Sequence, residues 1–174
     1  TGSQRIDAAL IASAPRLKIV ANMAVGYNNF DVDAMTAAGM QGTNTPDVLT
    51  ETTADFGFAL LMATARRLTE SEHFLRAGKW TTWRYDMFAG SDIHGSTLGI
   101  IGMGRIGQGI AKRGAHGFGM NVLYHNRSRL SPQLEGECKA RYVEKDELLR
   151  TADHVVLVLP YTPASHHTMG AAEL

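Results

Sequence analysis

The hydrophobic positions fall into short apolar runs separated by segments of helical periodicity, which is the pattern of a parallel α/β fold. Continuous apolar runs at 17–25, 98–101 and 153–160 are typical of strands covered on both faces. Shorter strands are expected at 40–43, from 121 onward and at 140–143. Helical segments are expected at 6–13, 33–38, 50–76 and 144–150, and another follows the turn at 102–107 and ends near residue 116. The polar stretch from Pro132 is predicted to be a loop. We therefore predict a Rossmann-like, doubly wound parallel sheet.

The segment 50–76 is the longest helical stretch, and it is apolar on almost all sides. In a domain this small, such a helix is expected between domains or between subunits, although core packing alone explains the same residues. The connector that follows it carries Trp80, Trp83, Tyr85 and Phe88. Such aromatic side chains are typical of an anchored loop or a dimer contact. If this surface is a subunit contact, we expect a homodimer.

Composition excludes several classes of protein. The 174 residues include 17 basic and 17 acidic side chains and are 44% hydrophobic, so no general attraction to nucleic acid or membranes is indicated. The longest apolar run, 56–65, is too short for a membrane span, and the single Cys138 permits no internal disulfide. Glu70 and His73 have metal-ligand spacing without the second pair that such sites require, so no metal is expected. We expect a cytoplasmic location.

Both ends of the chain resemble interrupted helical segments. Ile6 to Ala14 reads as the end of one helix, and 170–174 reads as the start of another. A two-halved dinucleotide fold needs about six strands, whereas at most four are expected after Leu98. The sheet is therefore predicted to be incomplete, as in a piece of a longer enzyme.

The turn after the second long apolar run has the spacing of a dinucleotide-binding turn, with Gly102, Gly104 and Gly107. Gly102 permits a tight reversal, Gly104 permits close approach of a pyrophosphate, and Gly107 permits close packing of helix on strand. Arg105 and Ile106 are the nearest backbone N–H donors at the positive end of the helix. Strand, turn, helix and second strand occur in order, which favours a nucleotide site over a purely structural turn.

The end of the following strand indicates which dinucleotide is bound. An NAD site usually has an acidic residue there, and this chain has Asn126, Arg127, Ser128 and Arg129. An amide, a hydroxyl and two guanidinium groups would hold a 2′-phosphate, which a carboxylate would repel. We predict NADPH over NADH, with ordinary loop arginines as the alternative. Leu159 and Pro160 leave the carboxyl end of another strand and are candidates for the nicotinamide side.

Several further motifs occur along the chain. They are Val25-Gly26-Tyr27-Asn28-Asn29-Phe30-Asp31, Asn44-Thr45-Pro46-Asp47-Val48-Leu49-Thr50, Thr53-Ala54-Asp55, Ala65-Arg66-Arg67, Leu98 to Gly107, and Leu159-Pro160-Tyr161-Thr162-Pro163. Together they resemble the D-isomer-specific 2-hydroxyacid dehydrogenases, most closely the branch of glyoxylate/hydroxypyruvate reductases and 2-ketogluconate reductases. The resemblance covers essentially the whole chain, and the order of its motifs makes it specific.

This resemblance implies two partial domains. Residues 1–46 would be part of a flavodoxin-like substrate domain, and 47–174 part of the dinucleotide-binding domain, including the long interface helix. It implies that backbone N–H groups at Val25 and Gly26 face the substrate carboxylate and that Thr53 lies against the cofactor. The alternatives are a simple turn glycine and a helix-start residue. The commonest family form has Asp where this chain has Asn28, which leaves the backbone donors unchanged.

The catalytic arginine, glutamate and histidine of the family lie downstream of the segment that matches 159–162. No catalytic residue is therefore expected within this chain. The implied function is NADPH-dependent reduction of a small 2-oxo acid, such as glyoxylate or hydroxypyruvate, to the D-2-hydroxy acid. A 2-ketogluconate reductase is one alternative, and a non-catalytic dinucleotide-sensing regulator on the same fold is another.

Overall fold

The computed structural model describes residues 1–174, and its contacts divide the chain into two compact units, Thr1–Leu49 and Thr50–Leu174. The division falls shortly after Pro46, where the sequence placed the end of the first domain. Each unit has its own buried apolar core. The two units are therefore described separately below.

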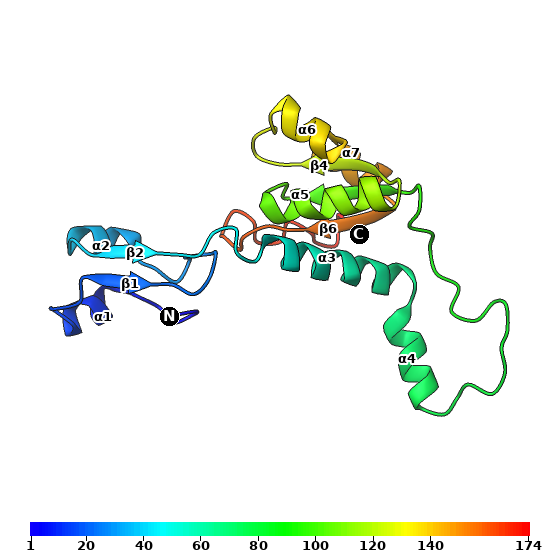
Figure 1. The fold of residues 1–174 in the computed structure, drawn as a ribbon, viewed down its shortest axis with the longest axis horizontal. Helices are drawn as coiled ribbons and strands as arrows, with labels where there is room; N and C mark the ends of the chain where they lie inside the picture. The colour runs from blue at the N-terminus through cyan, green and yellow to red at the C-terminus, as the bar shows by residue number, and fades with distance from the viewer. The chain divides into compact units, whose positions relative to one another are not determined.

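Unit 1 is a small parallel α/β unit, coloured blue to cyan in Figure 1. Its elements are α1 (Ala8–Ser13), β1 (Ile19–Ala21), α2 (Val32–Ala37) and β2 (Gln41–Thr43). The two strands pair in parallel, and Ile6, Val20, Met35 and Met40 form the core. The predicted strand over 17–25 is too long. It ends at Ala21 because side-chain hydrogen bonds hold the backbone beyond Asn22 in a loop.

Unit 2 contains a sheet of four parallel strands in the order β5-β4-β3-β6. The strands are β3 (Thr97–Ile101), β4 (Asn121–His125), β5 (Ala140–Tyr142) and β6 (His154–Leu157). The chain moves outward from β3 to β5 and then returns to place β6 on the other side of β3. This reversal beside β3 is the topological switch point of a doubly wound sheet, where ligands bind at the carboxyl ends of the strands.

Helices cover both faces of this sheet (Figure 1). On one face lie α3 (Thr50–Ala65) and α5 (Arg105–Lys112), which continues as the π-helical turn η1 (Arg113–Gly117). On the other face α7 (Lys145–Thr151) buries Leu148 against Ile101 and Leu123. None of these helices combines the length and apolarity that crossing a membrane requires.

The helix predicted over 50–76 is in fact two helices, α3 and α4 (Leu68–Arg76). Arg67 between them has a left-handed backbone, with φ 51°. The carbonyl oxygen of Ala65 would accept a hydrogen bond within an uninterrupted helix, but here it accepts one from the N–H of Ser91 at 2.9 Å. The returning connector thus replaces the next helical turn, which is why the apolar pattern did not reveal the break.

The prediction of a loop from Pro132 is also wrong, because Pro132–Cys138 forms the helix α6. Ser131 caps this helix by accepting a hydrogen bond from the N–H of Leu134, and proline occupies the first turn. Both are ordinary helix-start signals. The helix has only seven residues, too few to show a clear apolar period.

Candidate functional site

The turn between β3 and α5 requires two of its three glycines for packing. Gly102 has φ +101°, and a Cβ there would lie 2.3 Å from the carbonyl oxygen of Val158. A Cβ on Gly107 would lie 2.4 Å from the carbonyl oxygen of Gly102. The backbone therefore reverses tightly, and the first turn of α5 packs directly on the end of β3.

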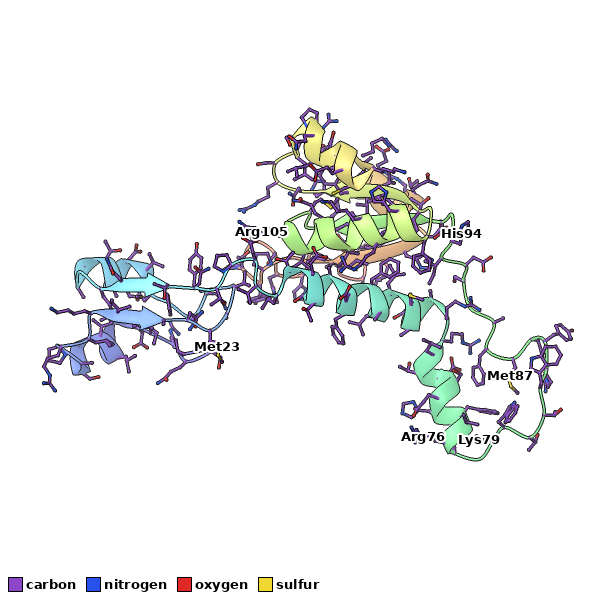
Figure 2. All side chains as sticks on the ribbon, viewed as in Figure 1. Met23, Arg76, Lys79, Met87, His94 and Arg105 are labelled. Carbon is purple, nitrogen blue, oxygen red and sulfur yellow. The ribbon has the colours of Figure 1, made fainter.

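Gly104 is different, because nothing in the protein fills the space beside it. A Cβ at this position would meet no atom within 4 Å, and the backbone is extended, with φ −76° and ψ −165°. Gly104 is the N-cap of α5 and has no side-chain cap, and the first helical bond runs from Gln108 N–H to its carbonyl oxygen at 2.9 Å. The N–H groups of Ile106 and Gly107 precede that bond, so they have no helical acceptor. This open, positive helix end, marked by Arg105 in Figure 2, fits a pyrophosphate.

The loop that leaves β4 is tied to the same turn. The side-chain oxygen of Asn126 accepts a hydrogen bond from the N–H of Met103 at 3.2 Å. Arg127 and Ser128 follow; both are exposed and make no hydrogen bond or ion pair within the protein. Asn126 therefore holds the start of the loop against the glycine turn, and Arg127 presents an uncompensated charge beside it.

The sequence predicted that both Arg127 and Arg129 would be available to bind a phosphate, but the guanidinium group of Arg129 is already paired. Its Nε and one terminal nitrogen donate to the two carboxylate oxygens of Glu135 on α6, at 2.8 and 2.9 Å. The hydroxyl of buried Tyr124 also donates to Glu135 and accepts from the N–H of Leu130, each at 2.8 Å. Sequence reasoning missed Glu135 because α6 was taken for a loop; the Ser131-Pro132 start signal could have revealed it.

These contacts shift the titration of the groups involved. The hydrogen bonds from Arg129 and then from Tyr124 hold the pKa of the Glu135 carboxyl below its usual value. Burial raises the pKa of the Tyr124 phenol, and the bond to Glu135 raises the pKa of Arg129. At neutral pH this part of the loop is therefore a closed ion pair, and the field of Arg129 is largely balanced by Glu135.

A groove of 500 Å³ lies between α3, α5 and β6. Thr53 on α3 and Ile106 on α5 both line it. Leu159 packs against the glycine turn, since its Cδ2 lies 2.9 Å from where a Cβ on Gly102 would stand. The carbonyl of Pro160 accepts from the Ser165 hydroxyl at 2.8 Å, which fixes the chain as it leaves β6. The structure thus gathers these residues beside the turn, and their contact with a cofactor stays a prediction.

In unit 1, the loop after β1 is held through its backbone carbonyl groups. The carbonyl oxygen of Val25 accepts from the side-chain amide of Asn44 at 2.8 Å, and that of Gly26 accepts from Asn22 at 2.7 Å. The backbone N–H groups of residues 24–29 donate to no protein acceptor. The loop therefore offers hydrogen-bond donors to solvent, as a site for a carboxylate requires.

Asn22 and Asn44 were not singled out by sequence reasoning. Asn22 interrupts the apolar run 17–25, in which Lys18 is the other polar residue, and it is only 2% exposed. A buried amide in an apolar run needs partners for all its polar atoms. The position of Asn22 in this run was therefore the sequence signal that its side chain shapes the loop.

No group of three or more histidine, cysteine, aspartate or glutamate side chains is arranged to hold a metal ion. Glu70 forms an ion pair with Arg67 instead, at 2.7 Å. The buried Cys138 is a free thiol, and burial raises its pKa. Glu70 is thus paired with Arg67, and the Cys138 thiol lies within the core.

Comparison with known proteins gives a consistent result. Residues 58–174 match the NAD-binding domain of the D-isomer-specific 2-hydroxyacid dehydrogenases. A curated glyoxylate reductase from Thermococcus gammatolerans is 52% identical over 99% of this chain and 52% of its own length. A crystal structure of a glyoxylate reductase from Paecilomyes thermophila has a TM-score of 0.84 at 38% identity, covering 97% of this chain and 50% of that one. A D-lactate dehydrogenase from Aquifex aeolicus, crystallised with NAD and lactic acid, has a TM-score of 0.83 at 29% identity over 97% and 49%. The chain thus spans about half the length of these relatives.

Proposed function

The chain belongs to the D-isomer-specific 2-hydroxyacid dehydrogenase family, and on that basis we propose that its protein reduces a small 2-oxo acid, with NADPH as the favoured cofactor. Glyoxylate and hydroxypyruvate are the proposed substrates, and the D-2-hydroxy acid is the product. The similarity to glyoxylate reductases supports the substrate class. The preference for NADPH is supported by Arg127 and by the absence of a carboxylate at the end of β4.

One observation carries the cofactor proposal: the first turn of α5 offers N–H donors behind an empty space at Gly104. Gly104, Arg105 and Ile106 would hold the pyrophosphate there through backbone donors and the helix dipole. Arg127 would bind the 2′-phosphate, with Ser128 as a further donor. When bound, NADPH supplies the hydride that reduces the carbonyl carbon.

The substrate end of the proposal rests on unit 1. The open N–H groups of Val25 and Gly26 would bind the carboxylate of the oxo acid and so fix the position of its carbonyl group. The arginine, histidine and glutamate that polarise the carbonyl and supply the proton in this family lie downstream of Thr162. The residues of this chain would therefore orient the reactants, and the proton chemistry would come from elsewhere in the protein.

A homodimer in the cytoplasm is also part of the proposal. Trp83 is 73% exposed and, with Leu75 and Trp80, lines a groove of 720 Å³ between α4 and the connector labelled at Lys79 and Met87 in Figure 2. Exposed tryptophan and leucine side chains gather here, aromatic residues are enriched in protein–protein interfaces, and a two-fold axis would pair this groove with itself. Sedimentation of Trp83→Ser should show a monomer, and an unchanged assembly state would refute this contact.

The test of function is a coupled absorbance assay of the complete protein with NADPH or NADH and a panel of 2-oxo acids. We expect glyoxylate or hydroxypyruvate to give the highest kcat/KM with NADPH, and Arg127→Ala to abolish the cofactor preference. A 2-ketogluconate reductase would favour the sugar acid. Binding of NADPH without turnover of any oxo acid would instead indicate the regulator.

A further inference from the structure

The loop after β1 has an asymmetry that its sequence alone does not demand. Between Ala24 and Gly26, every carbonyl oxygen is occupied by a donor from elsewhere in unit 1. That of Ala24 accepts from the N–H of Thr45 at 3.0 Å, and those of Val25 and Gly26 accept from Asn44 and Asn22. Over the same stretch no N–H is used. The loop just beyond Met23 in Figure 2 is thus held by its acceptors alone.

This arrangement fixes the orientation of two peptide planes. A peptide is planar, so a carbonyl held on one side of the chain directs the N–H of the next residue to the other side. Asn44 holds the carbonyl of Val25 and thereby sets the N–H of Gly26, while Asn22 holds the carbonyl of Gly26 and sets the N–H of Tyr27. Without these bonds, either plane could rotate and turn a carbonyl oxygen toward a bound anion, which would repel it.

The two asparagines are themselves held from outside the loop. Asn22 is 2% exposed and exchanges side-chain hydrogen bonds with Asn29, at 3.3 and 3.4 Å. Asn29 in turn donates to the carbonyl of Gln4 at 3.0 Å. Asn44 follows β2 directly, so its reach to Val25 links the ends of the two strands of this unit. Each amide therefore acts from a fixed position.

We propose that Asn22 and Asn44 are positioning residues for the substrate carboxylate, which act by holding the carbonyls of Gly26 and Val25 away from it. The proposal rests on the proposed function, because it assumes that this loop receives the oxo acid. Neither asparagine needs to touch the substrate. Their side-chain amides supply donors that a space-filling side chain cannot supply, and this separates the proposal from a purely structural role.

The test compares Asn44→Ala with Asn44→Asp in the complete protein. Aspartate has nearly the shape of asparagine but offers no N–H, and its charge would lie near the bound anion. We expect both variants to raise KM for glyoxylate by about tenfold or more, as loss of one orienting hydrogen bond allows. The KM for NADPH and the melting temperature should change little. Recovery of the wild-type KM in Asn44→Asp would overturn the proposal, because it would show that only volume matters.

Asn22→Ala gives a second measurement, and Asn121→Ala is the matched control. Asn121 is an exposed asparagine at the start of β4 whose side chain makes no hydrogen bond. We expect Asn22→Ala to raise the KM for glyoxylate as Asn44→Ala does, and Asn121→Ala to match wild type. If Asn22→Ala does not fold, the comparison of Asn44→Ala with Asn44→Asp decides the question. If the wild-type protein reduces no 2-oxo acid, the proposed function is wrong. Calorimetric binding of oxalate would then decide the role of the asparagines, with equal affinity in wild type and Asn44→Ala counting against it.

Discussion

Replacing Gly104 by alanine should separate cofactor binding from folding. A methyl group at this position meets no protein atom within 4 Å, and the backbone, with φ −76°, is open to any residue. The same change at Gly107 would drive a Cβ to 2.4 Å from the carbonyl oxygen of Gly102. Two glycines of one turn therefore have different reasons to be glycine. Only at Gly104 does the proposed function assign the requirement to a ligand.

The expected magnitudes follow from this geometry. Gly→Ala at an unstrained position stabilises a protein by about 0.4–1 kcal/mol through the unfolded state, and alanine is a poorer N-cap than glycine by a similar amount. The free energy of unfolding of Gly104→Ala should therefore stay within about 0.5 kcal/mol of wild type. The methyl group would push the pyrophosphate from its N–H donors, and one hydrogen bond to a charged group is worth about 1.5–3 kcal/mol. NADPH should thus bind roughly ten- to hundredfold more weakly.

The Kd for NADPH is measured by isothermal titration calorimetry. The free energy of unfolding of the same samples is measured by urea titration. Gly136→Ala on α6 is the matched control, because a Cβ there also meets no atom within 4 Å. The control should retain the wild-type Kd. Gly104→Ala with the Kd of wild type would refute the placement of the pyrophosphate at α5. A large loss of stability in Gly104→Ala would refute the reasoning about free space.

Three further predictions concern the groups around β4. Tyr124→Phe removes a hydroxyl that bonds to Leu130 and Glu135, so the free energy of unfolding should fall by about 1–3 kcal/mol in urea titration. Folding lowers the pKa of Glu135 from its ordinary value of 4.5. The ionised carboxylate therefore stabilises the fold above pH 4.5, and this effect is lost as the pH falls through the lowered pKa. The difference in unfolding free energy between wild type and Glu135→Gln should shrink in acid. Buried Cys138, whose pKa burial raises, should react with a thiol reagent only after denaturation.

The glycine turn and its flanking strands could be predicted because their requirements are local. A positive φ at Gly102 and the order of strand, turn and helix are written in consecutive residues. The apolar run of β3 likewise reports that both its faces are covered. The four strands after α4 were expected from these signals, and the structure confirms the parallel sheet.

What the sequence could not reveal depends on partners far along the chain. The end of α3 is decided by Ser91, which takes the carbonyl of Ala65. The pairing of Arg129 depends on Glu135, which reaches it only because α6 is helical. The donor-only loop likewise needs Asn44, brought to Val25 by strand pairing. In each case the local residues permit several outcomes, and a long-range hydrogen bond selects one.

The central position of β3 has a consequence for how unit 2 opens. β3 and β4 each pair on both sides, whereas β5 and β6 each have one neighbour. In hydrogen–deuterium exchange, the amides of β3 and β4 should therefore persist longest, while those of β5 and β6 exchange through smaller, more frequent openings. Because the glycine turn is a direct extension of β3, the nucleotide end would keep its shape during fluctuations that fray the margins.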